Sequence, residues 1–316
     1  MTLDPEVVRL REEAERADLR PLYTLSLAEA RRADLASITA NAGRPEPVDR
    51  ITDRFVPHDD SPVPIRVYRP SGRGPFPVLV YFFGGGWTLG TIDTSDAICR
   101  RLTNAAGCVT VAVGYRLAPE HRFPTAVHDC HAAVRWIAEH GAELDGDTAR
   151  LAVAGDSSGG NLAAAVTLLS RADGPPITAQ VLVYPATDQL SDSDSLRENN
   201  DPVFFNARSV AWYRSHYLKH PADASDPLAS PLRAPDLQGL PPALVITAEH
   251  DPLRDEGEQY ARRLGDDGVP VRLSRYPGMI HGFFAMSGTL AGGRQAMHEV
   301  AEYLRDSLAP TKKGLS

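Results

Sequence analysis

The stretch LAVAGDSSGGNLAAAVTLL, residues 151–169, contains the turn that decides the fold. Four apolar residues typical of a buried strand precede Gly155-Asp156-Ser157-Ser158-Gly159, and a segment rich in Ala and Leu, typical of a helix, follows it. A G-x-S-x-G pattern between a strand and a helix holds its serine on a tight turn, with the hydroxyl projecting above the sheet. The alternative is a glycine-rich turn that holds phosphate, but no Walker lysine or G-x-G-x-x-G spacing accompanies it. We therefore predict that Ser157 is a catalytic nucleophile.

Apolar strands alternate with helices on both sides of this turn. Continuous apolar strands separated by helices are typical of a mostly parallel sheet that is covered on both faces. Two earlier strands, 50–56 and 63–68, would meet at a turn over residues 58–61 and add an antiparallel start. The other expected strands are 76–83, 108–113, 151–154, 179–184, 243–247 and 271–275, and the expected helices are 96–106, 125–139, 158–170, 256–264 and 293–308. The predicted fold class is α/β, with an eight-stranded, mostly parallel sheet flanked by helices.

Two segments stand outside this alternation. Residues 1–48 contain two expected helices that are too polar to form a domain by themselves. Residues 189–239 are rich in Ser, Asp, Asn and Pro but carry a cluster of aromatic residues. An insertion of this size inside an α/β sheet is usually functional and often a lid. We expect one catalytic domain, residues 49–188 and 240–316, with a helical cap built from residues 1–48 and 189–239.

Composition excludes several classes of protein. The 33 Lys and Arg residues against 41 Asp and Glu residues give a net charge of -8, which argues against a nucleic-acid partner. The three cysteines, Cys99, Cys108 and Cys130, argue against a disulfide framework and indicate a reducing compartment. The charged first residues lack the apolar segment of a secretory signal, and no stretch approaches the roughly 18 apolar residues of a membrane span. We expect a cytoplasmic protein.

A nucleophilic serine requires a histidine base that a carboxylate orients. In this type of fold the acid and then the histidine follow the serine along the chain, each after a late strand. Asp251 follows the expected strand ALVIT, and His281 follows RLSRYP. Glu249 and Asp255 compete for the role of the acid, but Glu249 lies closer to the strand and Asp255 is expected to cap the next helix. The predicted triad is Ser157, Asp251 and His281.

The charge that develops on a substrate carbonyl oxygen requires N–H donors. The strand VLVYFF runs into Gly84-Gly85-Gly86-Trp87, and successive glycines allow the backbone to approach a substrate closely. The N–H of Ser158, at the start of a helix, can face the same oxygen. The two motifs together are much more specific than either alone.

Five motifs in this order resemble the hormone-sensitive-lipase-like family of α/β-hydrolases, especially its bacterial esterase branch. The resemblance covers about residues 60–310 and includes GGGW at 84–87, YRLAPEHRFP at 115–124, GDSSGG at 155–160, DPLRDEG at 251–257 and HGF at 281–283. It implies an α/β-hydrolase fold in which Gly85, Gly86 and Ser158 donate the oxyanion-hole hydrogen bonds. It also implies that the cap covers an acyl pocket, and it allows a homodimer through an edge strand of the sheet.

One position departs from the family pattern. The residue before the glycine run is normally a histidine that helps to shape the oxyanion loop, and here it is Phe83. That histidine is not the general base, so the predicted triad is unaffected. An aromatic ring must replace a hydrogen-bonding imidazole, either by packing into the core or as the sign of an unusual substrate.

Other residues could contribute to binding. Aromatic side chains of the insertion and of the glycine loop could line a substrate pocket or belong to the core; they are Trp87, Phe204, Phe205, Trp212 and Tyr213. His128 with His131, and His216 with His220, have the spacing of helical histidine pairs. Neither pair includes the Glu of H-E-x-x-H and the chain has no C-x-x-C, so we expect no metal site and no organic cofactor.

These observations predict a serine carboxylesterase that works through an acyl-enzyme, and the resemblance implies a small ester with a short- to medium-length acyl chain. An amidase or deacetylase would use the same triad. A binding-only receptor of the same fold would be expected to lack part of the triad, and an acyltransferase would need a cap that excludes water. The identity of the ester does not follow from the sequence, since pocket residues rather than the fold determine it.

Overall fold

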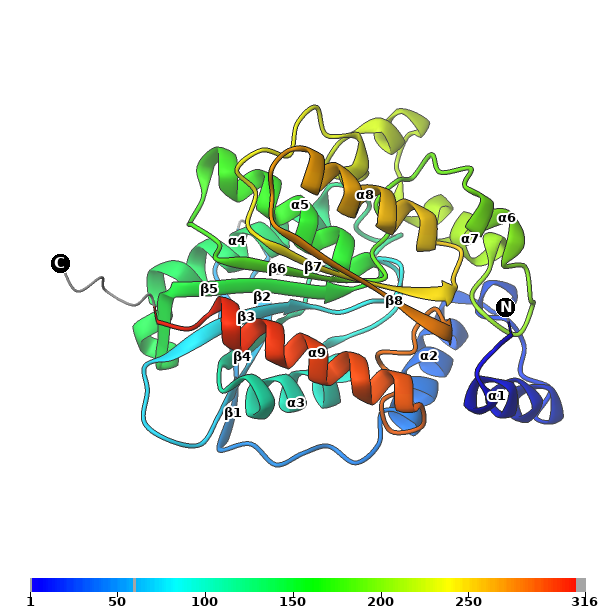
Figure 1. The fold of residues 1–316 in the computed structure, drawn as a ribbon, viewed down its shortest axis with the longest axis horizontal. Coiled ribbons are helices and arrows are strands. Elements are labelled where there is room, and N and C mark those ends of the chain that lie inside the picture. Colours follow the sequence, from blue (N-terminus) through cyan, green and yellow to red (C-terminus); the bar gives the residue numbers. More distant parts are fainter. Residues whose placement is uncertain (1, 59–60, 311–316) are drawn as a thin grey trace.

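One sheet organises the chain (Figure 1). The computed structural model describes residues 2–58 and 61–310, so Asp59 and Asp60 of the expected turn lie outside the described residues. The strand order is β1-β2-β4-β3-β5-β6-β7-β8, antiparallel between β1 and β2 and between β2 and β4, and parallel elsewhere. The strands are β1 (Arg50–Val56), β2 (Val63–Arg69), β3 (Phe76–Phe82), β4 (Val109–Val113), β5 (Gly146–Asp156), β6 (Ala179–Val183), β7 (Ala243–His250) and β8 (Val271–Ile280). The predicted α/β fold class with eight strands and an antiparallel start is confirmed.

Helices cover both faces of the sheet (Figure 1). One face carries α3 (Asp96–Ala106) and α9 (Ala291–Ser307), and the other carries α4 (Thr125–His140), α5 (Ser158–Asp173) and α8 (Arg254–Asp266). Successive side chains of a strand point to opposite faces. In β3, accordingly, Val78, Val80 and Phe82 belong to one buried cluster while Leu79 and Tyr81 belong to the other. This burial on both faces explains the continuous apolar runs in the sequence.

Short helices gather near the carboxyl ends of the parallel strands (Figure 1). They include α1 (Pro5–Arg16) and α2 (Leu27–Asn41) from the N-terminal segment, and α6 (Asp194–Glu198) and α7 (Ala207–Tyr217) from the insertion. Helix α2 begins at a capping box in which Ser26 and Glu29 exchange hydrogen bonds. Ala30 of α2 and Tyr213 of α7 pack together with Leu89 in a small buried cluster. The two segments expected to form a cap therefore contribute to one small cluster near the carboxyl ends of the strands.

Several element boundaries differ from the sequence-based expectation, and three of these findings bear on the site or on the predicted residues. Strand β5 begins at Gly146, because its first residues pair with Phe76 and Pro77 before an irregularity in the register. Strand β8 continues to Ile280 past a proline that an edge strand tolerates. Helix α7 ends at Tyr217, so His216 and His220 do not share a helix. Among the described residues, no helix is both long and apolar enough to cross a membrane.

Candidate active site

Ser157 lies on a strained turn between β5 and α5. Its φ of 57° and ψ of -117° fall in a region that a non-glycine residue rarely adopts. The flanking glycines permit the turn, because a Cβ on Gly159 would collide with the carbonyl oxygen of Phe82. The Ser157 N–H donates to the carbonyl of Val183 at 2.8 Å, which fixes the turn against β6. The serine side chain is thereby held at the carboxyl end of the sheet.

The three residues of the predicted triad lie in hydrogen-bond contact. His281 Nε2 is 2.9 Å from Ser157 Oγ, and His281 Nδ1 is 2.7 Å from Asp251 Oδ2. An ionised carboxylate only accepts hydrogen bonds, so Nδ1 carries the proton and Nε2 is left to accept from the serine hydroxyl. Asp251 is fully buried, and its other oxygen accepts from the N–H of Leu253 at 2.8 Å. This arrangement orients the imidazole ring toward Ser157.

The two competing carboxylates have other partners. Glu249 Oε2 accepts from the N–H of Gly278 at 2.8 Å. Asp255 Oδ2 accepts from the N–H of Ser195 at 2.8 Å, and Asp255 pairs with Arg254. Asp255 lies in the first turn of α8, which begins at Arg254, and so it is not the N-cap residue that the sequence led us to expect.

The glycine loop, residues 84–90, has the backbone geometry that close approach to a substrate requires. Gly85 and Gly86 have φ values of 123° and 59°, which favour glycine. The Gly85 carbonyl accepts from the N–H groups of Thr88 at 3.1 Å and Leu89 at 2.8 Å. Because the peptide unit is planar, the Gly86 N–H points away from these two donors. Within the described part of the chain, no acceptor is assigned to the N–H groups of Gly85 and Gly86.

Asp156 ties this loop to the nucleophile turn. Its Oδ1 accepts from the Gly84 N–H at 3.0 Å and from the Tyr81 hydroxyl at 2.7 Å. Burial raises the pKa of the Asp156 carboxyl above its ordinary value. The sequence placed Asp156 next to Ser157 but gave no sign of this link, because its partners lie more than seventy residues away.

Phe83 packs into the core. Its ring stacks on Tyr115 with centroids 4.3 Å apart, and the Tyr115 hydroxyl donates to the Phe83 carbonyl at 2.7 Å. Phe83 is 2% exposed. Of the two explanations that the sequence left open for this residue, the structure supports packing: the start of the loop is held through its backbone, without an imidazole.

A pocket opens beside the serine hydroxyl. Gly86, Ser157 and Ser158 line it together with apolar side chains from the loop, α7 and neighbouring turns. Of the five aromatic residues suggested by the sequence, Trp87, Phe205 and Tyr213 line this pocket. Phe204 and Trp212 do not: Phe204 is partly buried against one of the two large core clusters, and Trp212 packs on Tyr213 and His216. Phe205 also stacks on the His281 ring, with centroids 4.2 Å apart.

The pocket includes a polar wall that the sequence did not indicate. Arg214 donates to the carbonyl of Asp188 at 2.9 Å. Glu256 Oε1 accepts from the N–H groups of Thr187 and Asp188 at 2.8 and 3.1 Å. Burial raises the pKa of the Glu256 carboxyl to about 7 and lowers the pKa of the Arg214 guanidinium. Glu256 belongs to the DPLRDEG motif, whereas no local signal identifies Arg214.

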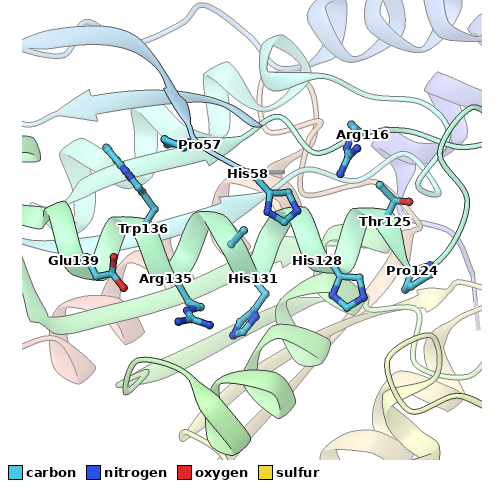
Figure 2. A pocket seen from close by; sticks show the side chains of 11 residues that line it. Pro57, His58, Arg116, Pro124, Thr125, His128, His131, Arg135, Trp136 and Glu139 are labelled. Carbon is cyan, nitrogen blue, oxygen red and sulfur yellow. The ribbon is translucent and has the colours of Figure 1, made fainter. Parts of the chain in front are cut away.

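A second hollow runs along α4 and contains none of the predicted triad (Figure 2). Its volume is about 650 Å³, and its lining includes His58, His128, His131 and Arg135. Figure 2 shows the side chains of His128, His131 and Arg135 projecting from the same helix. Among the described residues, no three His, Cys, Asp or Glu side chains form a group that could hold a metal ion.

The fold and the serine turn define an α/β-hydrolase. A family model described as the alpha/beta hydrolase fold matches residues 79–285. The chain belongs to this family, in its hormone-sensitive-lipase-like branch, and is an enzyme of the carboxylic ester hydrolase class.

Curated relatives and solved structures agree with this assignment. The chain is 38% identical to an arylesterase of Saccharolobus solfataricus over 97% of this chain and 99% of that protein. It is 45% identical to carboxylesterase NlhH of Mycobacterium tuberculosis over 74% of this chain and 75% of that protein. A hyperthermophilic esterase from the archaeon Pyrobaculum calidifontis superposes with a TM-score of 0.92 at 41% identity, covering 98% of this chain and 100% of the other.

Proposed function

We propose that this enzyme is a serine carboxylesterase in which Ser157 forms an acyl-enzyme. The observation that carries the proposal is the continuous line of hydrogen bonds from Asp251 through His281 to Ser157. His281 Nε2 takes the hydroxyl proton as Ser157 Oγ attacks the ester carbonyl, and the Asp251 carboxylate stabilises the resulting imidazolium.

The tetrahedral intermediate needs donors for its oxyanion, and we assign that role to the N–H groups of Gly85, Gly86 and Ser158. Gly86 and Ser158 line the same pocket as Ser157, and the peptide orientations in the loop leave the glycine N–H groups available. A single donor of this kind contributes about 3 kcal/mol to the transition state. The intermediate then collapses: the C–O bond to the alcohol breaks, and the alcohol oxygen takes the proton from His281.

Hydrolysis follows by the same chemistry in reverse order. A water molecule gives its proton to His281 and attacks the acyl carbonyl, and the bond to Ser157 Oγ breaks as the serine regains its proton. The free acid and the original enzyme result. No step requires a group beyond the chain and water.

The pocket lining supports an acyl chain of short to medium length. Trp87, Phe205 and Tyr213 provide apolar contacts near Ser157, but the wall also contains the buried polar groups of Arg214 and Glu256. A long alkyl chain would have to lie against these groups and displace any water that solvates them, which is unfavourable. A short acyl group avoids that cost.

The assignment of residues 1–48 and 189–239 as a cap is supported by the cluster that Ala30 of α2 and Tyr213 of α7 form with Leu89 near the carboxyl ends of the strands. The three cysteines are free and buried, which supports a reducing compartment such as the cytoplasm. A homodimer through an edge strand stays a prediction, for which β8 offers one free edge.

The test is hydrolysis of p-nitrophenyl esters from acetate to palmitate by the wild type and by Ser157→Ala. We expect activity that peaks at short or medium chains and falls at least a thousandfold in the variant, on the order of a triad deletion. Parallel assays with p-nitroanilides and with an added alcohol acceptor separate amide hydrolysis and acyl transfer from ester hydrolysis. Equal activity in the variant would refute the assigned nucleophile.

A further inference from the structure

We propose that Arg31 and Asp34, both on cap helix α2, are positioning residues that hold the oxyanion loop, residues 84–90, in its active geometry. This inference rests on the oxyanion hole proposed above. It gives the N-terminal segment a role in the chemical step in addition to covering the pocket.

Arg31 reaches from α2 to two segments of the catalytic domain. Its Nε donates to the carbonyl of Thr88 at 3.0 Å, and its Nη2 donates to the carbonyl of Ala118 at 3.1 Å. The guanidinium also pairs with Glu120 at 2.7 Å and lowers the pKa of that carboxyl to about 2. The Ala118 N–H in turn donates to the Trp87 carbonyl at 2.8 Å. One planar guanidinium thus fixes the middle of the loop and the segment beside it.

Asp34 lies one helical turn further along α2 and meets the end of the loop. The backbone N–H of Gly90 favours the ionised form of its carboxyl group and so acts to lower its pKa. The carboxyl oxygen Oδ2 is buried and has no hydrogen-bond partner among the described residues. Burial, followed by the charge of Asp156, raises the pKa of Asp34 to about 7. A protein seldom keeps a poorly partnered carboxyl in such a place without a compensating role.

The loop depends on support at both ends. Its start is fixed by the hydrogen bond from Gly84 to Asp156, and the Phe83 ring, buried against Tyr115, supplies no hydrogen bond. Its far part is fixed by α2 through the hydrogen bond from Arg31 to the Thr88 carbonyl. Thr88 links that end to the donors, because its N–H and hydroxyl bind the carbonyls of Gly85 and Gly86. A shift of α2 is therefore transmitted to the peptide unit between Gly85 and Gly86, whose N–H is one of the proposed donors, and to the peptide unit that follows it.

The charged and titratable groups around Asp34 come from three elements. Asp156 at the end of β5 and Tyr213 of α7 interact with it electrostatically, and Arg31 lies on its own helix. The charge of His281 acts to lower the pKa of Asp156, whereas burial raises it. Because these groups are coupled to one another, a pH profile alone would not isolate Asp34, and the test compares substitutions at a fixed pH.

The test measures kcat and KM for p-nitrophenyl butyrate at pH 7.5 in Arg31→Gln, Arg31→Lys, Asp34→Ala and Asp34→Asn. Misplaced donors weaken the transition state more than the bound substrate, so kcat should fall about tenfold or more while KM changes less than about threefold. Asparagine still offers an oxygen to the Gly90 N–H, so Asp34→Asn should lose less than Asp34→Ala. Lysine keeps one of the donor contacts, so Arg31→Lys should recover part of the loss in Arg31→Gln.

Two further measurements separate positioning from a general loss of structure. Ser157 Oγ adds to the carbonyl carbon of an alkyl trifluoromethyl ketone, and the adduct carries an oxyanion like that of the tetrahedral intermediate. The affinity of the enzyme for this inhibitor should therefore fall in proportion to kcat/KM. Titration with a p-nitrophenyl phosphonate counts the folded, reactive sites, and rates are expressed per reactive site. Arg32→Gln is the matched control, because Arg32 is an exposed arginine on the same helix.

Unchanged kcat per reactive site in Arg31→Gln and Asp34→Ala would overturn the proposal, as would a rise in KM alone with unchanged inhibitor affinity. Activity that survives in Ser157→Ala would instead refute the proposed function, so the two failures are distinguishable.

Discussion

The buried carboxyl of Glu256 makes the stability of this enzyme depend on pH in a way that one substitution should remove. Glu256 is 2% exposed, and burial raises its pKa from 4.5 to about 7. A carboxyl group whose pKa is raised by folding favours the folded state when it is protonated. Its contribution is therefore fully present below the unfolded pKa and is lost as the pH rises through the folded pKa.

The magnitude follows from the shift. Each pKa unit corresponds to 1.36 kcal/mol, so ionisation of Glu256 costs the folded enzyme about 3 kcal/mol between pH 4.5 and pH 8. Glu256→Gln keeps an oxygen for the N–H groups of Thr187 and Asp188 but cannot ionise. Relative to the wild type, the variant should gain about 5 °C in Tm when the pH is raised from 5 to 8. Asp34 contributes a similar dependence to both proteins, and it cancels in the comparison.

The assay is thermal unfolding by circular dichroism at pH 5, 6, 7 and 8 for the wild type, Glu256→Gln and the control Glu302→Gln. Glu302 is an exposed residue of α9, and its substitution should shift Tm equally at every pH. A Tm difference between Glu256→Gln and the wild type that stays constant from pH 5 to pH 8 would show that Glu256 ionises without penalty, and the reasoning would be wrong.

Three further predictions concern the catalytic machinery. Gly86→Ala should lower kcat at least a hundredfold, because a Cβ at this position collides with the Tyr213 ring and alanine disfavours the required positive φ. Steady-state kinetics with p-nitrophenyl butyrate measures the change, and a loss of kcat below threefold would contradict the prediction. Asp251→Asn should lower kcat about 10⁴-fold while KM stays near the wild-type value, since the histidine would lose its orienting carboxylate; a loss in KM alone would oppose this role. Phe83→His restores the residue that is usual in the family but buries a polar ring at this position. The variant should therefore be less stable by about 1–3 kcal/mol, measured as the free energy of unfolding in urea. A more stable variant would count against our account of the loop.

Local sequence patterns were sufficient to predict the sheet and to nominate the triad. The apolar runs at Phe76–Phe82 and Val109–Val113 are buried on both faces of the sheet, so no charged residue interrupts them, and the buried hydroxyl of Thr110 accepts a hydrogen bond from Thr103. The strand ends were less predictable: Gly146 and Asp147 pair with Phe76 and Pro77 of β3, but they lie in a polar and partly exposed segment that resembles a loop in the sequence. Ser157, Asp251 and His281 each follow a strand, and parallel strands bring their carboxyl ends to one edge.

The supporting contacts could not be predicted in this way. Arg31 and Thr88 are separated by 57 residues, and nothing in the N-terminal segment distinguishes Arg31 from the exposed Arg32 beside it. The aromatic residues of the insertion were equally ambiguous. Phe204 and Phe205 are neighbours in the sequence, yet one packs into the core and the other stacks on His281, because the backbone turns between them. Such choices depend on tertiary packing rather than on residue type.

The central claim is that Ser157 is the nucleophile and that His281 activates it. The most direct measurement is covalent labelling with a p-nitrophenyl alkylphosphonate, followed by mass spectrometry of the intact protein and of its peptides. We predict one adduct per chain, located on Ser157, absent from Ser157→Ala and formed at least a hundredfold more slowly in His281→Ala. An adduct on a different residue, or labelling of His281→Ala at the wild-type rate, would contradict the account.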